Sequence, residues 1–325
     1  MTGLEVLVTE PIMARFAEVL TRGGSSPHRW TFAFGDDPAL AAAAPSADVL
    51  VCSSVSPALL STMPALRLLH VTGAGLDKIP LDILPSDVRV ANTFHHGRSI
   101  AEHVLMVSTM LLRGVLRSEH DMRAGVWRNL MVTPDFPFGR VLADLTLGVV
   151  GFGEIGTSVA RMGLALGMDV RAVRRDTTAP VPAGLEGVRI GDDLDALLES
   201  SDVVVLTVPL NDATLGLIDG AALARMRPTA ILVNVSRGGV VDEQALHDAL
   251  TDRAIAGAAL DVWWRNPRDP DRPPPSHLDF AGFDNVVLTP HQSGHTEEVF
   301  AGRARDITDN VDALAEGRPL RNRVR

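Results

Sequence analysis

The stretch Leu145-Thr-Leu-Gly-Val-Val-Gly-Phe-Gly-Glu-Ile-Gly156 decides the fold. It begins with an apolar run that is typical of a buried strand, and this run leads directly into Gly151-x-Gly153-x-x-Gly156. Helix-compatible sequence without a proline follows through residues 157–166. The order predicts a strand, a tight turn and a helix.

Three glycines at this spacing suit a turn that binds a dinucleotide. Gly151 allows the tight turn, Gly153 lets the backbone approach a pyrophosphate, and Gly156 lets the helix pack on the strand. The phosphates would meet free N–H groups at the helix N-terminus. A tight turn without a ligand is the alternative interpretation, but the strand and the helix on either side favour dinucleotide binding.

Length and composition indicate a packed α/β protein. At 325 residues the chain exceeds a single typical core, so we expect two domains. Its 46% hydrophobic and 22% charged residues are ordinary for a soluble protein, and no apolar run reaches the roughly 18 residues of a membrane span. The start of the chain, Leu4-Glu-Val-Leu-Val-Thr9, resembles a strand and not a signal peptide, so we expect a cytoplasmic protein.

Charge and cysteine content exclude further classes. The formal net charge of −10 argues against a nucleic-acid surface, because phosphate binding needs a basic face. Cys52 lies in an apolar run, where a small buried side chain is a better interpretation than a nucleophile.

Apolar runs alternate with helix-like or turn segments on both sides of the glycine motif, which predicts two parallel sheets. A Ser99-x-x-Glu102 capping box predicts a helix from Ser99 to about Leu116. Residues 266–277 are rich in proline and predict a loop, and a last helix over residues 297–316 should end at Gly317. The expected strands are residues 6–8, 30–34, 47–51, 66–71 and 88–91 before the motif, and 170–173, 203–208, 230–235, 256–262 and 285–288 after it.

Six further motifs accompany the glycine motif in order along the chain. They are Gly73-Ala-Gly-Leu-Asp77, Ile100-Ala-Glu-His103, Val208-Pro209, Val233-Asn-Val-Ser-Arg-Gly-Gly-Val-Val-Asp-Glu243, Ala258-Ala-Leu-Asp-Val262 and Thr289-Pro-His-Gln-Ser-Gly294. Together the motifs resemble the D-isomer-specific 2-hydroxyacid dehydrogenase family. That family includes glyoxylate/hydroxypyruvate reductases, phosphoglycerate dehydrogenase, formate dehydrogenase and phosphite dehydrogenase.

The resemblance implies two doubly wound parallel α/β domains, Rossmann-like and flavodoxin-like. A discontinuous substrate domain would comprise residues 1–98 and 290–325, and a dinucleotide-binding domain residues 99–289. It also implies a homodimer, held largely through the dinucleotide-binding domains. The acid group of the substrate would meet the N–H groups of Ala74, Gly75 and Leu76, with His96 nearby. The expected cofactor-binding residues are Gly151, Phe152, Gly153, Glu154, Ile155, Gly156, Arg174, Arg175, Val208, Pro209, Val235, Ser236, Asp261, Ser293 and Gly294.

Two side chains have the chemistry that hydride transfer to a 2-oxo acid needs. A cation must hold the carboxylate and polarise the carbonyl, and an acid/base group must move the hydroxyl proton. Arg237 follows a buried strand, and its planar guanidinium matches a carboxylate. His291 follows the last expected strand and can transfer the proton.

The sequence departs from the family at the partner of the histidine. In the family a glutamate lies 29 residues after the arginine, and here that position is Asn266. An amide can orient the imidazole but does not favour its protonated form, so we expect a weaker acid. Formate dehydrogenase has glutamine at this place, which leaves a formate- or phosphite-type dehydrogenase open. A loop shifted in register, or a slow enzyme of the ordinary type, is the other alternative.

A second departure concerns the cofactor. Family members that use NAD carry an aspartate 18 residues after the last glycine, bound to the adenosine ribose. That position here is Arg174, followed by Arg175. Two guanidinium groups attract a 2′-phosphate, so we predict a preference for NADP(H) over NAD(H). In the alternative interpretation both arginines face solvent and Asp176 binds the ribose.

We therefore predict an NADP(H)-dependent oxidoreductase that acts on the CH–OH group of a small 2-hydroxy acid or reduces the 2-oxo acid. Arg237, His291 and Asn266 would form its catalytic group, with Asn266 as a neutral orienting partner. The competing class is a nucleotide-sensing protein that kept the fold and lost turnover. No metal is expected, because His95 and His96 lack a third nearby ligand.

Overall fold

The computed structural model describes residues 3–265 and 273–325. The chain divides into two compact units. Unit 1 comprises residues 1–95 and 295–325, and unit 2 comprises residues 96–294. The division expected from the sequence lies a few residues away, after residues 98 and 289.

Unit 1 contains a five-stranded sheet in the order β2-β1-β3-β4-β5, with every neighbouring pair parallel. The order reverses once, between β1 and β3, as in flavodoxin-like folds. Successive side chains of a strand point to opposite faces, so Val6 and Val8 pack on one face while Leu7 packs on the other. The strands are β1 (Glu5–Val8), β2 (Arg29–Phe32), β3 (Val49–Cys52), β4 (Leu68–Val71) and β5 (Arg89–Ala91).

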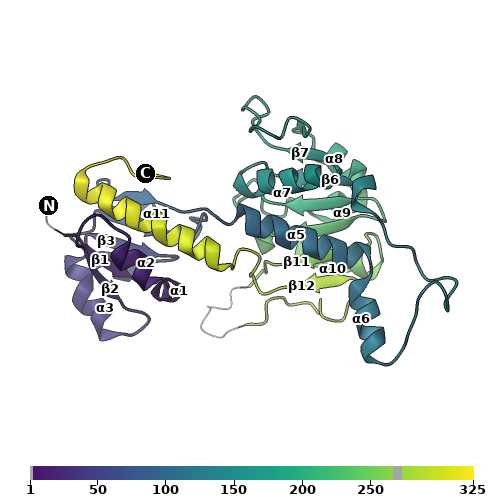
Figure 1. Cartoon of the computed structure of the whole chain (residues 1–325), viewed down its shortest axis with the longest axis horizontal. Coiled ribbons are helices and arrows are strands. Elements are labelled where there is room, and N and C mark those ends of the chain that lie inside the picture. The colour runs from purple at the N-terminus through teal and green to yellow at the C-terminus, as the bar shows by residue number, and fades with distance from the viewer. Residues whose placement is uncertain (1–2, 266–272) are drawn as a thin grey trace. The chain divides into compact units, whose positions relative to one another are not determined.

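Helices cover both faces of the unit 1 sheet. One face packs against α1 (Pro11–Ala14), α2 (Ala17–Arg22) and α11 (Glu297–Glu316). The other packs against α3 (Pro38–Ala43), η1 (Ala44–Ser46) and α4 (Pro57–Ser61). In Figure 1 the last long helix, α11 in yellow, lies among elements from the start of the chain. Its bounds agree with the sequence expectation, and Gly317 ends it in the left-handed conformation with φ of 70°.

Unit 2 contains a seven-stranded parallel sheet in the order β12-β11-β10-β9-β6-β7-β8. Counted from β6, this is the Rossmann order with one further strand, and it reverses between β6 and β9. The two sheets confirm the expected doubly wound α/β fold. The strands are β6 (Thr146–Val150), β7 (Asp169–Val173), β8 (Arg189–Gly191), β9 (Val203–Leu206), β10 (Ile231–Asn234), β11 (Gly257–Leu260) and β12 (Val286–Leu288).

Two helical layers enclose the unit 2 sheet. The first layer consists of α5 (Gly97–Leu112) and α7 (Glu154–Ala165), whose apolar residues pack with Val149 and Val205. The second layer consists of α8 (Leu194–Ser200), α9 (Gly220–Arg225) and α10 (Glu243–Thr251). The remaining helical elements are α6 (Val115–Arg123), η2 (Leu142–Asp144) and η3 (Gly238–Val240).

The helix that the sequence predicts from Ser99 begins earlier, so the predicted start is wrong. Helix α5 begins at Gly97, its N-cap residue is His96, and no side chain caps it in the manner of a capping box. Ser99 lies inside the helix and donates from Oγ to Ser293 O at 2.7 Å, while Glu102 pairs with Arg98. The helix also ends earlier than expected, because Gly114 has φ of 60° and separates α5 from α6.

No single helix of the described residues is long and apolar enough to cross a membrane. Helices α5 and α6 reach the required length and hydropathy only as a pair, which is bent by 64° at its break. Helix α5 buries Ile100, Val104 and Val107 in the core of unit 2.

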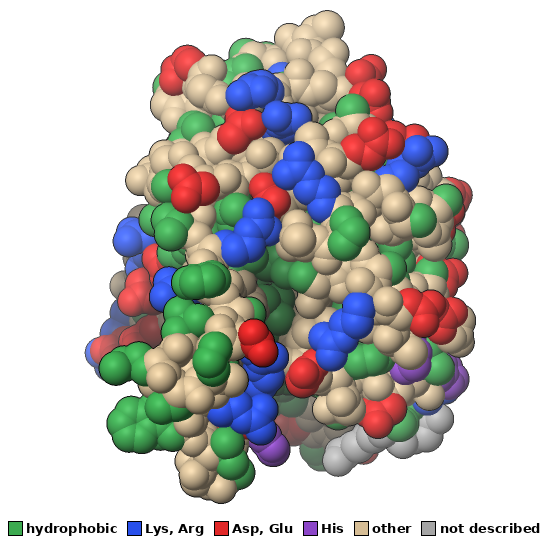
Figure 2. All heavy atoms as spheres, turned by 90° about the vertical axis from the view of Figure 1, so that its right-hand side faces the viewer, with side chains coloured by type: hydrophobic (Ala, Val, Ile, Leu, Met, Phe, Trp, Pro, Cys, Tyr) green, Lys and Arg blue, Asp and Glu red, His purple; other side chains and the backbone are tan. Residues whose placement is uncertain are grey.

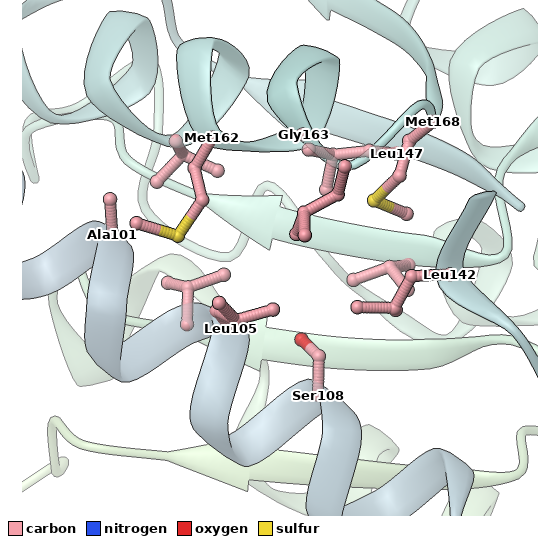
Figure 3. A pocket seen from close by; sticks show the side chains of 12 residues that line it. Ala101, Leu105, Ser108, Leu142, Leu147, Met162, Gly163 and Met168 are labelled. Atoms are coloured by element: carbon pink, nitrogen blue, oxygen red, sulfur yellow. The ribbon is translucent and has the colours of Figure 1, made fainter.

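A small apolar pocket lies between α5 and α7, and Figure 3 shows the side chains that line it. Met168 and Val203 place this pocket near the amino ends of β7 and β9. Ser108 is its main polar side chain, and its buried hydroxyl lacks a hydrogen-bond partner within the described part of the chain. In doubly wound sheets ligands bind beyond the carboxyl ends of the strands, so this pocket is not the candidate site.

Asp202 anchors the amino edge of the unit 2 sheet. Only 4% of the residue is exposed, and it accepts hydrogen bonds from Thr146 N at 2.9 Å, Arg140 Nη2 at 2.7 Å and Arg227 Nη1 at 3.3 Å. Burial by itself would raise the pKa of Asp202, but the Thr146 amide and the two guanidinium groups outweigh burial and hold this pKa below its ordinary value.

Asp202→Asn should lower the free energy of unfolding at neutral pH by about 1–3 kcal/mol, because an amide cannot replace the charge-assisted bonds. The pKa in the folded state is below that in the unfolded state, so this stabilisation is present above the unfolded pKa. It is lost as pH falls through the folded pKa. Urea denaturation across pH should therefore show a difference between wild type and variant that shrinks in acid.

The matched control for this experiment is Asp195→Asn. Its carboxylate pairs with Arg225 but its side chain is 56% exposed, so the variant should change stability by less than about 0.5 kcal/mol. An Asp202→Asn effect that is equally small, or that does not depend on pH, would contradict the role given to Asp202.

Candidate functional site

The glycine turn joins β6 to α7, and the atoms around Gly151 and Gly156 are closely packed. Gly151 has φ of 95°, and a Cβ there would lie 2.8 Å from Val208 Cγ1. A Cβ on Gly156 would lie 2.1 Å from Gly151 O, so the missing side chain lets the start of α7 approach the turn. Apart from its own neighbours in the chain, no heavy atom of the described residues lies within 4 Å of a Cβ built on Gly153. The turn therefore fits a pyrophosphate, since its backbone is open at the start of α7.

Thr207 fixes this turn from the neighbouring strand. It directly follows β9, and its Oγ1 donates to Gly151 O at 2.8 Å, with Val150 O also within reach at 3.1 Å. Val208 and Pro209 are among the residues predicted from the sequence, and Thr207 is not. Its position, a hydroxyl at the end of a buried strand next to β6, is the signal that could have found it.

Arg174 lies beside the glycine turn. Its guanidinium is 5.7 Å from the centre of the Phe152 ring, and it donates to Ala179 O. Arg175, the next residue, is exposed. Asp176 accepts from both the N–H and the hydroxyl of Thr178, and the Thr178 hydroxyl is the main cause that lowers the Asp176 pKa. Arg174 thus contacts a residue of the turn.

Asn234 organises the turn that carries Arg237. This last residue of β10 is fully buried, and its Oδ1 accepts from the Ser236 N–H and hydroxyl at 3.1 and 2.9 Å. Its Nδ2 donates to Arg237 O at 3.0 Å. Arg237 Nη1 in turn donates to Ser236 O at 2.8 Å. Asn234 is not among the site residues predicted from the sequence.

Asp261 organises the loop that carries His291. The carboxylate is 1% exposed and accepts from Thr289 Oγ1 at 2.6 Å, Gln292 N at 2.9 Å and Ser293 N at 3.0 Å. His291 lies within this bonded segment and has φ of 59°, a left-handed conformation that is strained for a histidine. The three bonds to Asp261 hold the backbone on both sides of the strained residue.

His103 borders the same loop from α5. Its Nε2 lies 3.5 Å from Thr289 Oγ1. Burial lowers the pKa of His103, and the negative charge of Asp261 opposes this effect only in part. His103 is therefore shifted toward its neutral form. The proton-transfer role predicted from the sequence belongs to His291.

The two adjacent histidines have different partners. His96 is buried, and its Nε2 lies 3.5 Å from Glu154 Oε2, while Gly97 N donates to Glu154 Oε1 at 2.9 Å. His95 Nε2 lies 2.8 Å from Asp306 Oδ2 within unit 1. Each histidine thus pairs with a different carboxylate. The pair with Glu154 places His96 beside the residue that follows Gly153.

The predicted site residues fall into two groups. Ala74, Gly75 and Leu76 follow β4 in unit 1, where Asn92 Nδ2 donates to Ala74 O at 2.9 Å. Asn266 lies outside the described residues. The remaining predicted residues belong to unit 2, most of them beyond the carboxyl ends of β6, β7, β9, β10, β11 and β12: Gly151, Phe152, Gly153, Glu154, Ile155, Gly156, Arg174, Arg175, Val208, Pro209, Val235, Ser236, Arg237, Asp261, His291, Ser293, Gly294 and, at the start of α5, His96.

Comparisons with known proteins identify the family of the chain. The model of the "D-isomer specific 2-hydroxyacid dehydrogenase, NAD binding domain" matches residues 105–293. (S)-Sulfolactate dehydrogenase of Chromohalobacter salexigens is 39% identical over 256 residues, which is 78% of this chain and 79% of that protein.

Solved structures resemble the whole chain. D-Lactate dehydrogenase of Aquifex aeolicus, complexed with NAD and lactic acid, has a TM-score of 0.80 and 27% identity over 96% of each chain. NADPH-dependent glyoxylate/hydroxypyruvate reductase of Sinorhizobium meliloti, in complex with NADP and sulfate, has a TM-score of 0.81 and 26% identity over 98% of this chain and 97% of that one. The chain belongs to the D-isomer-specific 2-hydroxyacid dehydrogenase family of NAD(P)-dependent oxidoreductases.

Proposed function

We propose that this enzyme reduces a small 2-oxo acid to the 2-hydroxy acid with NADPH, and catalyses the reverse reaction with NADP. One observation carries the proposal. Arg237 and His291 follow β10 and β12, on either side of β11, at the same sheet edge as the glycine turn. Each lies in a loop whose backbone is fixed by a buried side chain, Asn234 or Asp261.

The residues of the chain have distinct roles in this reaction. A bound nicotinamide supplies the hydride acceptor or donor. Arg237 binds the substrate carboxylate through its planar guanidinium and polarises the carbonyl. His291 donates the proton to the developing hydroxyl during reduction and accepts it during oxidation. The N–H groups of residues 74–76 bind the acid group, and His96, whose partner is Glu154, lines the substrate pocket.

Asn266 is the reason to keep a second candidate function. A neutral amide at this position gives less support to a protonated imidazole than a carboxylate does. Oxidation of formate or phosphite needs less proton transfer from the histidine, so a dehydrogenase of that type would tolerate the amide. A sensor without turnover would also tolerate it, but has no chemical need for both Arg237 and His291.

Initial rates of NADPH and NADH oxidation should identify the reaction. The 2-oxo acids to test are glyoxylate, hydroxypyruvate, pyruvate, phenylpyruvate and 3-sulfopyruvate, the last because a similar protein is named sulfolactate dehydrogenase. We expect NADPH-dependent reduction of at least one, and loss of about 100-fold or more in kcat for His291→Gln. Asn266→Glu should keep its rate to higher pH than wild type, because the carboxylate favours imidazolium.

Other outcomes would reject parts of this proposal. Oxidation of formate or phosphite without reduction of any 2-oxo acid would establish the second candidate function. Tight NADPH binding without turnover of any of these compounds would favour a sensor. An Asn266→Glu variant with an unchanged pH profile would contradict the role of Asn266.

The cofactor preference rests on Arg174. Its guanidinium contacts Phe152 of the glycine turn, while Asp176 is engaged with Thr178. The Nε atom of Arg174 is buried and has no hydrogen-bond partner within the part of the chain that the structure describes. A 2′-phosphate on the adenosine ribose would give this guanidinium a charged acceptor, which supports NADP(H) over NAD(H).

Arg174→Asp should weaken NADPH binding about 10- to 100-fold while changing NADH binding much less, because a charge-assisted bond is replaced by repulsion. Fluorescence titration with each nucleotide measures both dissociation constants. Arg175→Asp shows how much the second arginine contributes. Arg123→Asp, at an 81% exposed side chain on α6, is the control for general charge reversal. Equal NADPH affinity in wild type and Arg174→Asp would support ribose binding by Asp176 instead.

We also propose that the enzyme is a homodimer held through unit 2. The segment after α6 exposes several large apolar side chains, and Figure 2 shows hydrophobic side chains gathered on the face that includes this part of unit 2. Clusters of this kind are uncommon on monomers and favour protein association. The exposed fractions are 73% for Trp127, 91% for Met131, 66% for Val132, 83% for Phe138 and 60% for Val141.

Light scattering after size-exclusion chromatography should give twice the chain mass of 34.7 kDa. The double variant Trp127→Ser/Met131→Ser should shift the protein toward monomer, because it removes apolar area from the interface. Leu215→Ser is the matched control, since Leu215 is 68% exposed in a different part of unit 2 and should leave the mass unchanged. A wild-type monomer at high concentration would contradict the dimer.

A further inference from the structure

Trp263 contacts both loops that carry the proposed catalytic residues. It follows Asp261 by two positions, and its indole Nε1 donates to Thr289 O at 2.9 Å. Its backbone lies against Gly238, where a Cβ would be 2.3 Å from both C and O of Trp263. Thr289 begins the loop of His291, and Gly238 directly follows Arg237. A single residue thus touches the Arg237 turn with its backbone and the His291 loop with its side chain.

Trp264 holds the other end of the Arg237 turn. Its Nε1 donates to Val241 O at 2.8 Å, at the residue that follows η3. The indole stacks on Phe280 at 5.4 Å with an interplanar angle of 17°, and meets Trp263 edge to face at 6.5 Å. The stacked aromatic rings give this tryptophan a fixed position, so its N–H can hold the turn in one place.

The geometry points to Trp263 and Trp264 as positioning residues that fix Arg237 relative to His291. Trp264 binds the far end of the Arg237 turn, Trp263 packs on its near end, and the Trp263 indole joins this turn to the His291 loop. Their significance for catalysis rests on the roles proposed above for Arg237 and His291. Neither tryptophan needs to touch the substrate for this purpose.

We call these contacts of Trp263 and Trp264 with the two loops the brace. Two features of the loops explain why it matters. His291 has a left-handed backbone, which persists only where surrounding bonds hold it. Gly238 is packed so closely on the Trp263–Trp264 backbone that the Arg237 turn must follow any movement of that segment. Misplacement of either group by about 1 Å can reduce turnover by about 100-fold, since the substrate must meet both at once.

Trp263→Phe and Trp264→Phe test the inference, because each keeps an aromatic ring and removes one N–H donor. Trp30→Phe is the matched control, since Trp30 is a partly buried tryptophan of unit 1. With the 2-oxo acid that wild type reduces, kcat should fall about 10- to 100-fold in Trp263→Phe, while KM and NADPH affinity change far less. The control should keep wild-type kcat.

Hydrogen–deuterium exchange gives a second measurement that does not need turnover. Trp263→Phe should speed amide exchange in residues 289–293, where Gln292 N and Ser293 N bind Asp261. Trp264→Phe should speed exchange in residues 238–241, where Val241 N donates to Gly238 O. Trp30→Phe should change neither segment.

The two measurements separate this inference from the proposed function. Unchanged exchange in both segments would overturn the brace even if the enzyme reduces 2-oxo acids. Faster exchange in a protein without any turnover would support the brace and reject the proposed function. Faster exchange with unchanged kcat would reject the positioning role, because the loops would then be free to move without loss of activity.

Discussion

The loops that leave a parallel sheet contain backbone N–H and C=O groups that no neighbouring strand can pair, and this constraint shapes the carboxyl edge of unit 2. Three side chains at the strand ends satisfy it: Thr207 bonds to the glycine turn, Asn234 to the Arg237 turn and Asp261 to the His291 loop. Each lies immediately beyond or at the end of a buried strand, so the sheet itself fixes where it can reach. Each loop is therefore fixed by a side chain at the end of a strand, in addition to any contact with another loop.

Charged side chains near the glycine turn also have partners that fix them in place. Glu154 is the first residue of α7, where a negative charge suits the helix dipole but opposes a bound phosphate. One of its oxygens accepts a hydrogen bond from Gly97 N, and the other lies 3.5 Å from His96 Nε2. These two contacts join the start of α5 to the turn. The half-buried Arg174 adds positive charge near Phe152 of the turn. The region can thus accept an anion despite a carboxylate one residue from Gly153.

The parts of the structure that depend on local sequence could be predicted. The glycine motif, the apolar strands and α11 follow from short patterns, because the residues that decide them are close neighbours in the chain. The start of α5 could not be predicted in this way. Glu154 accepts the Gly97 amide from 57 positions away, so the Ser99 capping box is not used. The edge strand β8 could not be predicted, because its three residues, one exposed and two partly buried, form no apolar run.

The candidate site shows the same division. Arg237 and His291 lie within recognisable motifs, and both lie at the expected sheet edge. The bonds that fix them come from elsewhere: Asp261 reaches a loop about 30 positions later, and Ser99 bonds to Ser293 O across 194 positions. No periodicity within one segment contains that information. The sequence analysis gives Asp261 a cofactor role, and the structure adds its three bonds to the loop of His291.

The discontinuous composition of unit 1 has a consequence for how the chain folds during synthesis. One face of its sheet is completed by Ile307, Val311 and Leu314 of α11, which pack with residues as early as Val6 and Val8. These contacts span almost the entire chain, so that face remains exposed to solvent until the ribosome has released the last helix. Unit 2 is continuous and can close its core earlier. The apolar face of the first strands of unit 1 is therefore the surface that a chaperone would need to protect longest.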